Sequence, residues 1–178
     1  MFEQEFSKHK NDWPKNSLIR GGKKYFPPYD LIGIALKIKN KYDKKNNIWL
    51  GKENKEGEWA VAYHGVGKGK IFEKVLNIIN ENLKEGHGQL YDKQVNVEKN
   101  KDEYPYCGEG VYFSPNIEEA LKYAGKTSLG WYNLNFQFVI MARVNPNKIR
   151  SPGGVPVIWI LNGNDDEIRP YRLLIKIT

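Results

Sequence analysis

The chain has 178 residues and a net charge of +7, with 40% apolar and 13% aromatic residues. These proportions exclude a disordered chain and indicate one folded domain, and the single cysteine, Cys107, excludes an internal disulfide and a multi-cysteine zinc site. No apolar run approaches the roughly 20 residues of a membrane span and the N-terminus lacks a signal-peptide core, so we expect an intracellular protein, cytoplasmic or nuclear.

The first 57 residues are predicted to be an N-terminal arm followed by a lysine-rich strand region. Residues 1–30 contain three prolines and no clear hydrophobic period, which indicates an irregular arm. Partial alternation of apolar residues predicts a strand at 31–39, and the apolar triplet at 48–50 predicts a short return strand. The sequence assigns no role to 1–57, and we expect 31–57 to form one compact unit with the rest of the chain.

Lysine is concentrated in one stretch of this region. Seven lysines and two acids lie between Lys37 and Lys55. Clustered lysine attracts phosphates or acidic partners, but lysine also keeps an exposed strand edge from pairing with other chains. This stretch therefore does not by itself make the chain a nucleic-acid-binding protein.

The remaining residues, 58–178, predict an α+β domain. A strand at 58–65 precedes a helix at 70–86, whose apolar residues recur on one face and which Gly86 ends. A long polar loop follows, of a kind that is often functional. The other predicted elements are a short strand before Ser114, a helix at 116–124, and strands at 136–146, 155–161 and 168–177.

Two adjacent aromatic residues stand between a glycine-rich turn and the helix at 116–124. Tyr112 ends the short strand, and Tyr123 follows on the helix, so the two rings could face each other across a flat ligand. Phe113 points the other way along the strand, toward the core. Core packing is the alternative explanation for both tyrosines.

The strand end "AYHG", the helix and loop after it, and "GEGVYFSP" resemble, in order and spacing, the catalytic domain of the poly(ADP-ribose) polymerase family. The resemblance covers residues 58–177. It implies an α+β fold of two packed β-sheets flanked by helices, with an NAD cleft between the sheets. It also implies ADP-ribosyltransferase activity with NAD as co-substrate and no metal.

The resemblance implies a His-Tyr-x signature in which His64 and Tyr112 are catalytic and bind NAD. Gly65 would offer its backbone N–H and C=O to the nicotinamide carboxamide, and glycine permits that close approach. Tyr112 and Tyr123 would hold the nicotinamide ring between them. The loop 87–107 would lie over the ligand. An ordinary hydrogen-bonded histidine is the alternative for His64.

The third signature position departs from the family pattern. Polymerising members carry a glutamate where this chain has Val157. A carboxylate there would stabilise the cationic sugar of the transition state, which valine cannot do. Ala120 and Val66 stand where the family often has hydroxyl residues.

Glu109 is the candidate replacement acid, because it lies three residues before Tyr112. Exposure to solvent is the alternative for Glu109. Asp102 and Glu103 on the covering loop are further candidates, and the acids at 165–167 are expected to be distant.

The sequence therefore predicts a mono-ADP-ribosyltransferase that transfers one ADP-ribose to a protein or nucleic-acid acceptor and builds no polymer. Two alternatives keep the fold: a module that binds NAD or ADP-ribose without transfer, and an NAD glycohydrolase. A tRNA 2′-phosphotransferase would need a basic set in the pocket, which Arg143 and Arg169 do not clearly supply. His9 and His87 cannot be paired into a metal site from the sequence.

Overall fold

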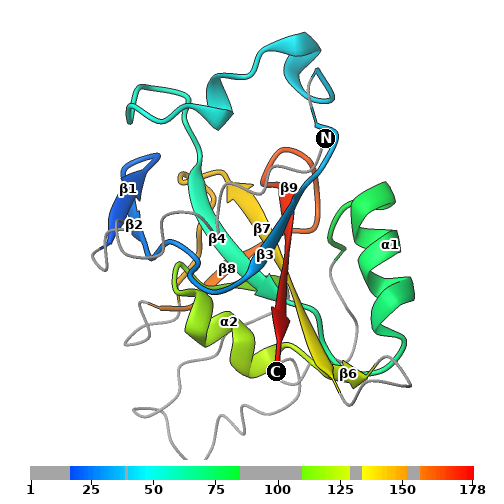
Figure 1. Cartoon of the computed structure of the whole chain (residues 1–178). Helices are drawn as coiled ribbons and strands as arrows, with labels where there is room; N and C mark the ends of the chain where they lie inside the picture. Colours follow the sequence, from blue (N-terminus) through cyan, green and yellow to red (C-terminus); the bar gives the residue numbers. More distant parts are fainter. Residues whose placement is uncertain (1–16, 39, 85–109, 129–133, 152–156) are drawn as a thin grey trace, which may run out of the picture.

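The computed structural model describes residues 17–38, 40–84, 110–128, 134–151 and 157–178. This part of the chain is a mixed α+β structure, mostly sheet, with two α-helices (Figure 1). The predicted α+β class is confirmed. The elements are β1 (Leu18–Arg20), β2 (Lys23–Tyr25), β3 (Ile32–Ala35), the 3₁₀ helices η1 (Asp43–Lys45) and η2 (Ile48–Leu50), β4 (Ala60–Gly65), α1 (Ile71–Glu81), β5 (Val111–Phe113), α2 (Ile117–Tyr123), β6 (Lys126–Ser128), β7 (Asn135–Val144), β8 (Trp159–Leu161) and β9 (Ile168–Ile177).

The central sheet has five antiparallel strands, in the order β3-β9-β7-β4, with β6 added beside β7. Its longest strands, β7 and β9, have ten residues each. The strand β7 is buried from Gln137 to Val144, as its apolar sequence predicts, and half of the residues of β9 are buried. The register shifts between Met141 and Ala142, opposite Pro170. Proline donates no ladder hydrogen bond, so an irregularity at this point is where a strand tolerates it.

Both faces of the central sheet are covered. Alternate residues of β4 point to opposite faces. Ala60, Ala62 and Val66 join a core that includes residues of α1, β5 and β8. Val61 and Tyr63 join a second core that includes α2 and Tyr25 of the β1–β2 hairpin. The strand β4 is therefore buried between two layers, which explains its continuous apolar sequence.

A second, two-stranded sheet is attached to the free edge of β4. Its strands β5 and β8 pair antiparallel, with Tyr112 opposite Ile160. Tyr63 of β4 and Ser114, just after β5, exchange two backbone hydrogen bonds of 2.8 and 2.9 Å. These two bonds connect the small sheet to the central one.

Two predictions for the first 57 residues are wrong. Residues 18–25 form the β1–β2 hairpin, turned at Gly21 and Gly22 with φ of 54° and 71°, and not an irregular arm. Residues 48–50 form η2 and not a strand. In this helix Trp49 is buried, with 1% of its surface exposed, because its ring packs against Tyr42 and Trp59.

The helix predicted at 70–86 is shorter in the structure, and so is the strand predicted at 155–161. The helix α1 ends at Glu81, because Asn82 has a φ of 72° that leaves the helical conformation. Gly86 lies outside the described residues. Phe72 and Leu76 of α1 are 45% and 59% exposed, so the apolar residues of this helix do not all lie on its buried face. Of residues 157–161, the part of the predicted strand 155–161 that the structure describes, β8 alone is a strand.

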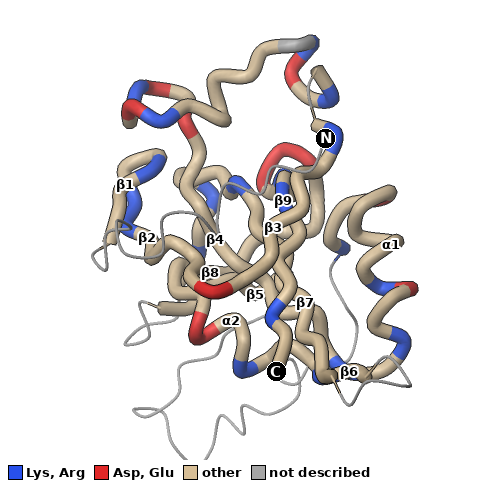
Figure 2. Tube along the Cα trace, viewed as in Figure 1, with Lys and Arg blue, Asp and Glu red and all other residues tan. Residues whose placement is uncertain are grey.

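Two buried arginines anchor residues 40–59, a largely irregular segment that crosses the end of the sheet. Arg143 of β7 donates hydrogen bonds to the carbonyl oxygens of Trp59, Leu50 and Gly51 at 2.5, 3.0 and 2.8 Å. The lysine-rich stretch therefore lies mostly in irregular backbone and not along a strand edge. Figure 2 shows basic residues on several other elements too, including α1 and the β1–β2 hairpin.

Arg169 of β9 is the second anchor. Its Nη1 and Nη2 atoms donate to the two carboxylate oxygens of Asp43 at 2.5 and 2.8 Å. Its guanidinium carbon also lies 4.1 Å from the ring centroid of Trp59 and 4.8 Å from that of Tyr42. The hydrogen bond from Arg169 lowers the pKa of the Asp43 carboxyl, although partial burial opposes the shift. This ion pair compensates the positive charge of the buried Arg169 guanidinium.

Replacing Asp43 tests this anchor. We expect Asp43→Asn to lower the free energy of unfolding by about 1–2 kcal/mol, because it removes the charge from a hydrogen-bonded pair whose carboxylate is partly solvated. Asp166→Asn, at an exposed turn position, is the matched control and should change it by less than about 0.5 kcal/mol. Urea unfolding of both variants measures the difference. Equal stabilities would show that Asp43 anchors nothing.

Candidate functional site

The C-terminal end of β4 presents an open backbone edge at Gly65. Val66 N–H donates to the Phe138 carbonyl of β7 at 2.9 Å. Because ladder bonds alternate along an antiparallel strand, Tyr63 and Gly65 direct their N–H and C=O groups to the opposite edge. Tyr63 uses its pair on Ser114, but Gly65 makes no backbone hydrogen bond there to any residue the structure describes. One donor and one acceptor therefore lie side by side at this edge, unpaired within the described ranges.

His64 is the reason that the ladder between β4 and β5 stops here. A continued ladder would pair Gly65 with Tyr112, two residues along from the Tyr63–Ser114 pair. The Tyr112 carbonyl oxygen instead lies 2.8 Å from His64 Nδ1. Since a carbonyl only accepts, Nδ1 is the protonated nitrogen and donates to it.

The protonation state of His64 follows from this bond and from burial. Burial lowers the pKa of the imidazole below its usual value, and the hydrogen bond to Tyr112 opposes that effect only in part. The ring is therefore neutral at pH 7, and its Nε2 atom carries a lone pair. No described residue donates to Nε2. This atom can accept a hydrogen bond from a ligand hydroxyl.

The backbones of both tyrosines lie close to the Gly65 edge. Tyr112 is half-buried in the middle of β5, on the strand that faces Gly65. Tyr123 is the last residue of α2 and 41% exposed. The structure thus brings His64, Gly65, Tyr112 and Tyr123, four of the residues that the sequence predicted for the site, close together from β4, β5 and α2.

Gly65 also has a packing role that the sequence interpretation missed. A Cβ at this position would lie 2.2 Å from the Ala120 carbonyl oxygen and 2.8 Å from the Ala124 backbone nitrogen. The helix α2 therefore rests directly on the backbone of β4, and only glycine permits this distance. The same contact places Tyr123, one residue before Ala124, beside Gly65.

The structure describes all three positions that depart from the family pattern. Val157 lies in a turn two residues before β8, with 40% of its surface exposed. Ala120 is buried against β4. Val66 is buried, and its carbonyl accepts from Gly125 N–H at 2.8 Å. None of the three side chains offers a hydroxyl or a carboxylate to the site.

Several predicted candidates cannot be placed. Glu109, the candidate acid, lies outside the described residues, and so do Cys107, His9, His87 and the loop 87–107 with Asp102 and Glu103. In the turn at 165–167, Asp165 accepts a hydrogen bond from Asn82, and Glu167 accepts two from Asn162. These interactions occupy both carboxylates.

The structure bears on three further expectations. Arg143 and Arg169 are occupied in anchoring residues 40–59, so they supply no phosphate-binding set to the site. Within the described ranges, no group of three or more His, Cys, Asp and Glu residues is placed to hold a metal ion. No helix in the same ranges has the length and apolarity to cross a membrane.

Lys74 supports the site and was not predicted. Its Nζ atom donates to the Lys68 carbonyl at 2.5 Å and reaches the Gly67 carbonyl at 3.5 Å. These bonds fix the glycine-rich turn between Gly65 and α1. Lys74 is an exposed residue of α1, and nothing in the sequence distinguishes it from the other lysines.

No protein-family model matches the sequence, and no curated protein matches it. The resemblance to the poly(ADP-ribose) polymerase family therefore depends on the order and spacing of the sequence motifs.

The contact between Gly65 and α2 gives a direct test. We expect Gly65→Ala to lower the free energy of unfolding by about 3 kcal/mol, because the added methyl group overlaps the Ala120 carbonyl. Gly67→Ala is the matched control, since a Cβ there meets nothing within 4 Å. Urea unfolding of the two variants should separate them clearly. Similar losses in both would contradict the close approach of the helix.

His64 should make stability depend on pH. Its pKa in the folded protein is lower than in the unfolded chain, so the unfolded state takes up the proton first as the pH falls below about 6.5. Its contribution is complete above that value and is lost as the pH falls toward the folded-state pKa. The slope from this one proton is at most about 1.4 kcal/mol per pH unit. His64→Gln keeps a donor for Tyr112 but does not titrate.

The measurement is urea unfolding of both proteins at about pH 7.5 and about pH 5.5. Wild type should lose more stability than His64→Gln over this interval. His9 and His87 are present in both proteins, so the difference isolates His64. The same loss in the two proteins would show that His64 is not buried as a neutral ring.

Proposed function

We propose that this protein is a mono-ADP-ribosyltransferase that uses NAD as donor and modifies a protein or nucleic-acid acceptor. The observation that carries the proposal is the open N–H and C=O of Gly65, with the Nε2 lone pair of His64 beside it. The backbones of Tyr112 and Tyr123 lie close to the same edge. This set of groups has the chemistry of a nicotinamide riboside site, on a chain whose motif order resembles that family.

The Gly65 edge fits a carboxamide. A primary amide has a carbonyl oxygen that accepts and an NH₂ group that donates, in one plane and on neighbouring atoms. It can therefore pair with the backbone N–H and C=O of a single residue at once. A carboxylate of the same shape has no hydrogen for the Gly65 carbonyl, so the edge should discriminate against nicotinate.

The neighbouring side chains fit the rest of the donor. The nicotinamide ring of NAD is cationic, and tyrosine faces attract cations as well as flat rings. The neutral His64 accepts at Nε2, which suits a ribose hydroxyl. Together these residues would orient the bond between the ribose and nicotinamide for transfer.

The chemistry that follows limits the activity to a single transfer. The nicotinamide leaves with the electron pair of the glycosidic bond, and an acceptor nucleophile attacks the ribose carbon and loses its proton. A carboxylate would stabilise the positive ribose and polarise an acceptor hydroxyl, which is typically a ~10²–10⁴-fold contribution. Val157 can do neither, so chain elongation is not expected.

The same valine favours the alternative of a module that binds NAD or ADP-ribose without transfer. By the order of the motifs, Val157 takes the place of the usual acid, and Ala120 takes the place of a serine that often hydrogen-bonds the carboxamide in the family. An NAD glycohydrolase, in which water replaces the acceptor, is the remaining enzyme of this type.

Incubation with NAD labelled in the ADP-ribose part, with and without cell lysate, tests the proposal. We expect one labelled unit on an acceptor and no ladder of polymer when products are separated by size. Tyr112→Ala should weaken NAD binding by about 1–3 kcal/mol, as expected for loss of a stacking ring. Phe72→Ala, which removes a half-exposed aromatic on α1, is the matched control and should leave binding unchanged.

The other outcomes separate the alternatives. Free ADP-ribose would indicate the glycohydrolase, and binding without turnover would indicate the module. A polymer ladder would contradict single transfer. Nicotinamide should compete with NAD and nicotinate should not. Equal competition by the two would contradict the role of Gly65.

A further inference from the structure

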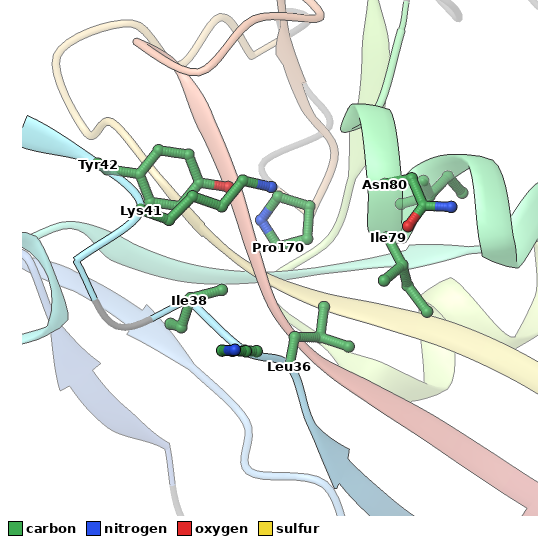
Figure 3. Close-up of a pocket in the computed structure, with 9 residues that line it drawn as sticks. Leu36, Ile38, Lys41, Tyr42, Ile79, Asn80 and Pro170 are labelled. Carbon is green, nitrogen blue, oxygen red and sulfur yellow. The ribbon is translucent and has the colours of Figure 1, made fainter.

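A separate cavity of about 210 Å³ lies between α1, the start of β9 and the segment that follows β3 (Figure 3). None of the residues proposed for NAD binding contributes to it. Five of the nine residues that line it are apolar, Leu36, Ile38 and Ile79 among them, and the other four are polar or charged. An apolar cavity of about 150 Å³ is enough to take up a benzene ring, so this one has room for a small apolar body.

The rim of the cavity is positive. Lys37 and Lys41 both contribute to its lining. Of the two acids nearby, Asp43 is paired with Arg169, whereas Asp165 accepts only from the neutral Asn82 amide and keeps its negative charge. Neither lysine forms a salt bridge with an acid in the described part of the chain, and the Lys41 ammonium lies 5.3 Å from the centroid of the Tyr42 ring. An anionic group at this rim would therefore meet two lysines and one carboxylate, a net positive charge.

One buried polar group in the wall lacks a partner. Tyr42 is 5% exposed, and its hydroxyl makes no hydrogen bond to any described residue. Figure 3 shows the ring end that carries this hydroxyl directed toward Pro170, across the cavity from Ile79 and Asn80. A buried hydroxyl without a partner costs free energy, and an acceptor oxygen in the cavity would remove that cost.

We propose that this cavity binds a small monocarboxylate whose apolar body is the size of one aromatic ring or a chain of about eight carbons. The apolar body lies against Leu36, Ile38 and Ile79. The carboxylate accepts from the Tyr42 hydroxyl and lies near Lys41. A neutral molecule of the same shape would leave the lysine charge unused and binds more weakly.

Titration of the full chain with octanoate, by calorimetry and by amide NMR shifts, tests the proposal, with 1-octanol as the neutral control. We expect saturable binding of one octanoate, at least about tenfold tighter than octanol. Lys41→Gln and Tyr42→Phe should each weaken octanoate binding about fivefold or more. Lys24→Gln, an exposed lysine on β2, is the matched control and should change nothing. Leu36→Trp should abolish binding by filling the cavity.

Tyr42→Phe keeps the test decisive if Leu36→Trp fails to fold. It removes an unsatisfied hydroxyl, so the unliganded protein should unfold at the same or a higher urea concentration while octanoate affinity falls. Absence of saturable binding at about 10 mM octanoate would overturn the proposal. So would equal affinity for octanol, an unaltered affinity in Tyr42→Phe, or an equal loss in Lys24→Gln and Lys41→Gln.

Discussion

Two backbone hydrogen bonds between Tyr63 and Ser114 determine how the site is built. They fasten the small β5–β8 sheet to the edge of β4, and the pairing then stops after this one residue pair. It stops because the carbonyl that would receive the next bond, on Tyr112, is taken by the imidazole of His64. The edge of Gly65 is left open as a result. The site is therefore the point where the ladder between β4 and β5 ends. There β4 remains paired with β7, and β5 remains paired with β8.

This arrangement constrains Gly65 in two ways, through its backbone groups and through its lack of a side chain. Its backbone groups lie at the open edge, while the absence of a side chain lets α2 rest on the strand. The helix contact in turn places Tyr123 at the site. Packing and recognition therefore use the same residue, and a change made for either purpose would disturb the other.

The sequence was informative where local pattern and packing agree. The strand β7 was predicted because its long apolar run is buried on both faces. His64 and Tyr112 were expected at one site because of the family resemblance, and the structure joins them through the bond to the Tyr112 carbonyl. The β1–β2 hairpin was missed because three-residue strands show no period. The η2 helix was missed because the position of Trp49 depends on packing against the rings of Tyr42 and Trp59. The three apolar residues at 48–50 do not by themselves indicate this tertiary contact.

The way Arg143 holds residues 40–59 has an evolutionary consequence. Its guanidinium binds three main-chain carbonyls, which every amino acid carries. Arg143 itself therefore requires no particular side chain at these three positions, and a substitution of Leu50 would keep its bond. Trp59 and Gly51 are restricted for other reasons: the Trp59 ring lies 4.1 Å from the Arg169 guanidinium carbon, and a Cβ at Gly51 would lie 2.5 Å from the Glu58 side chain. The sequence of this segment can therefore vary at some positions and not at others, although one arginine holds its path.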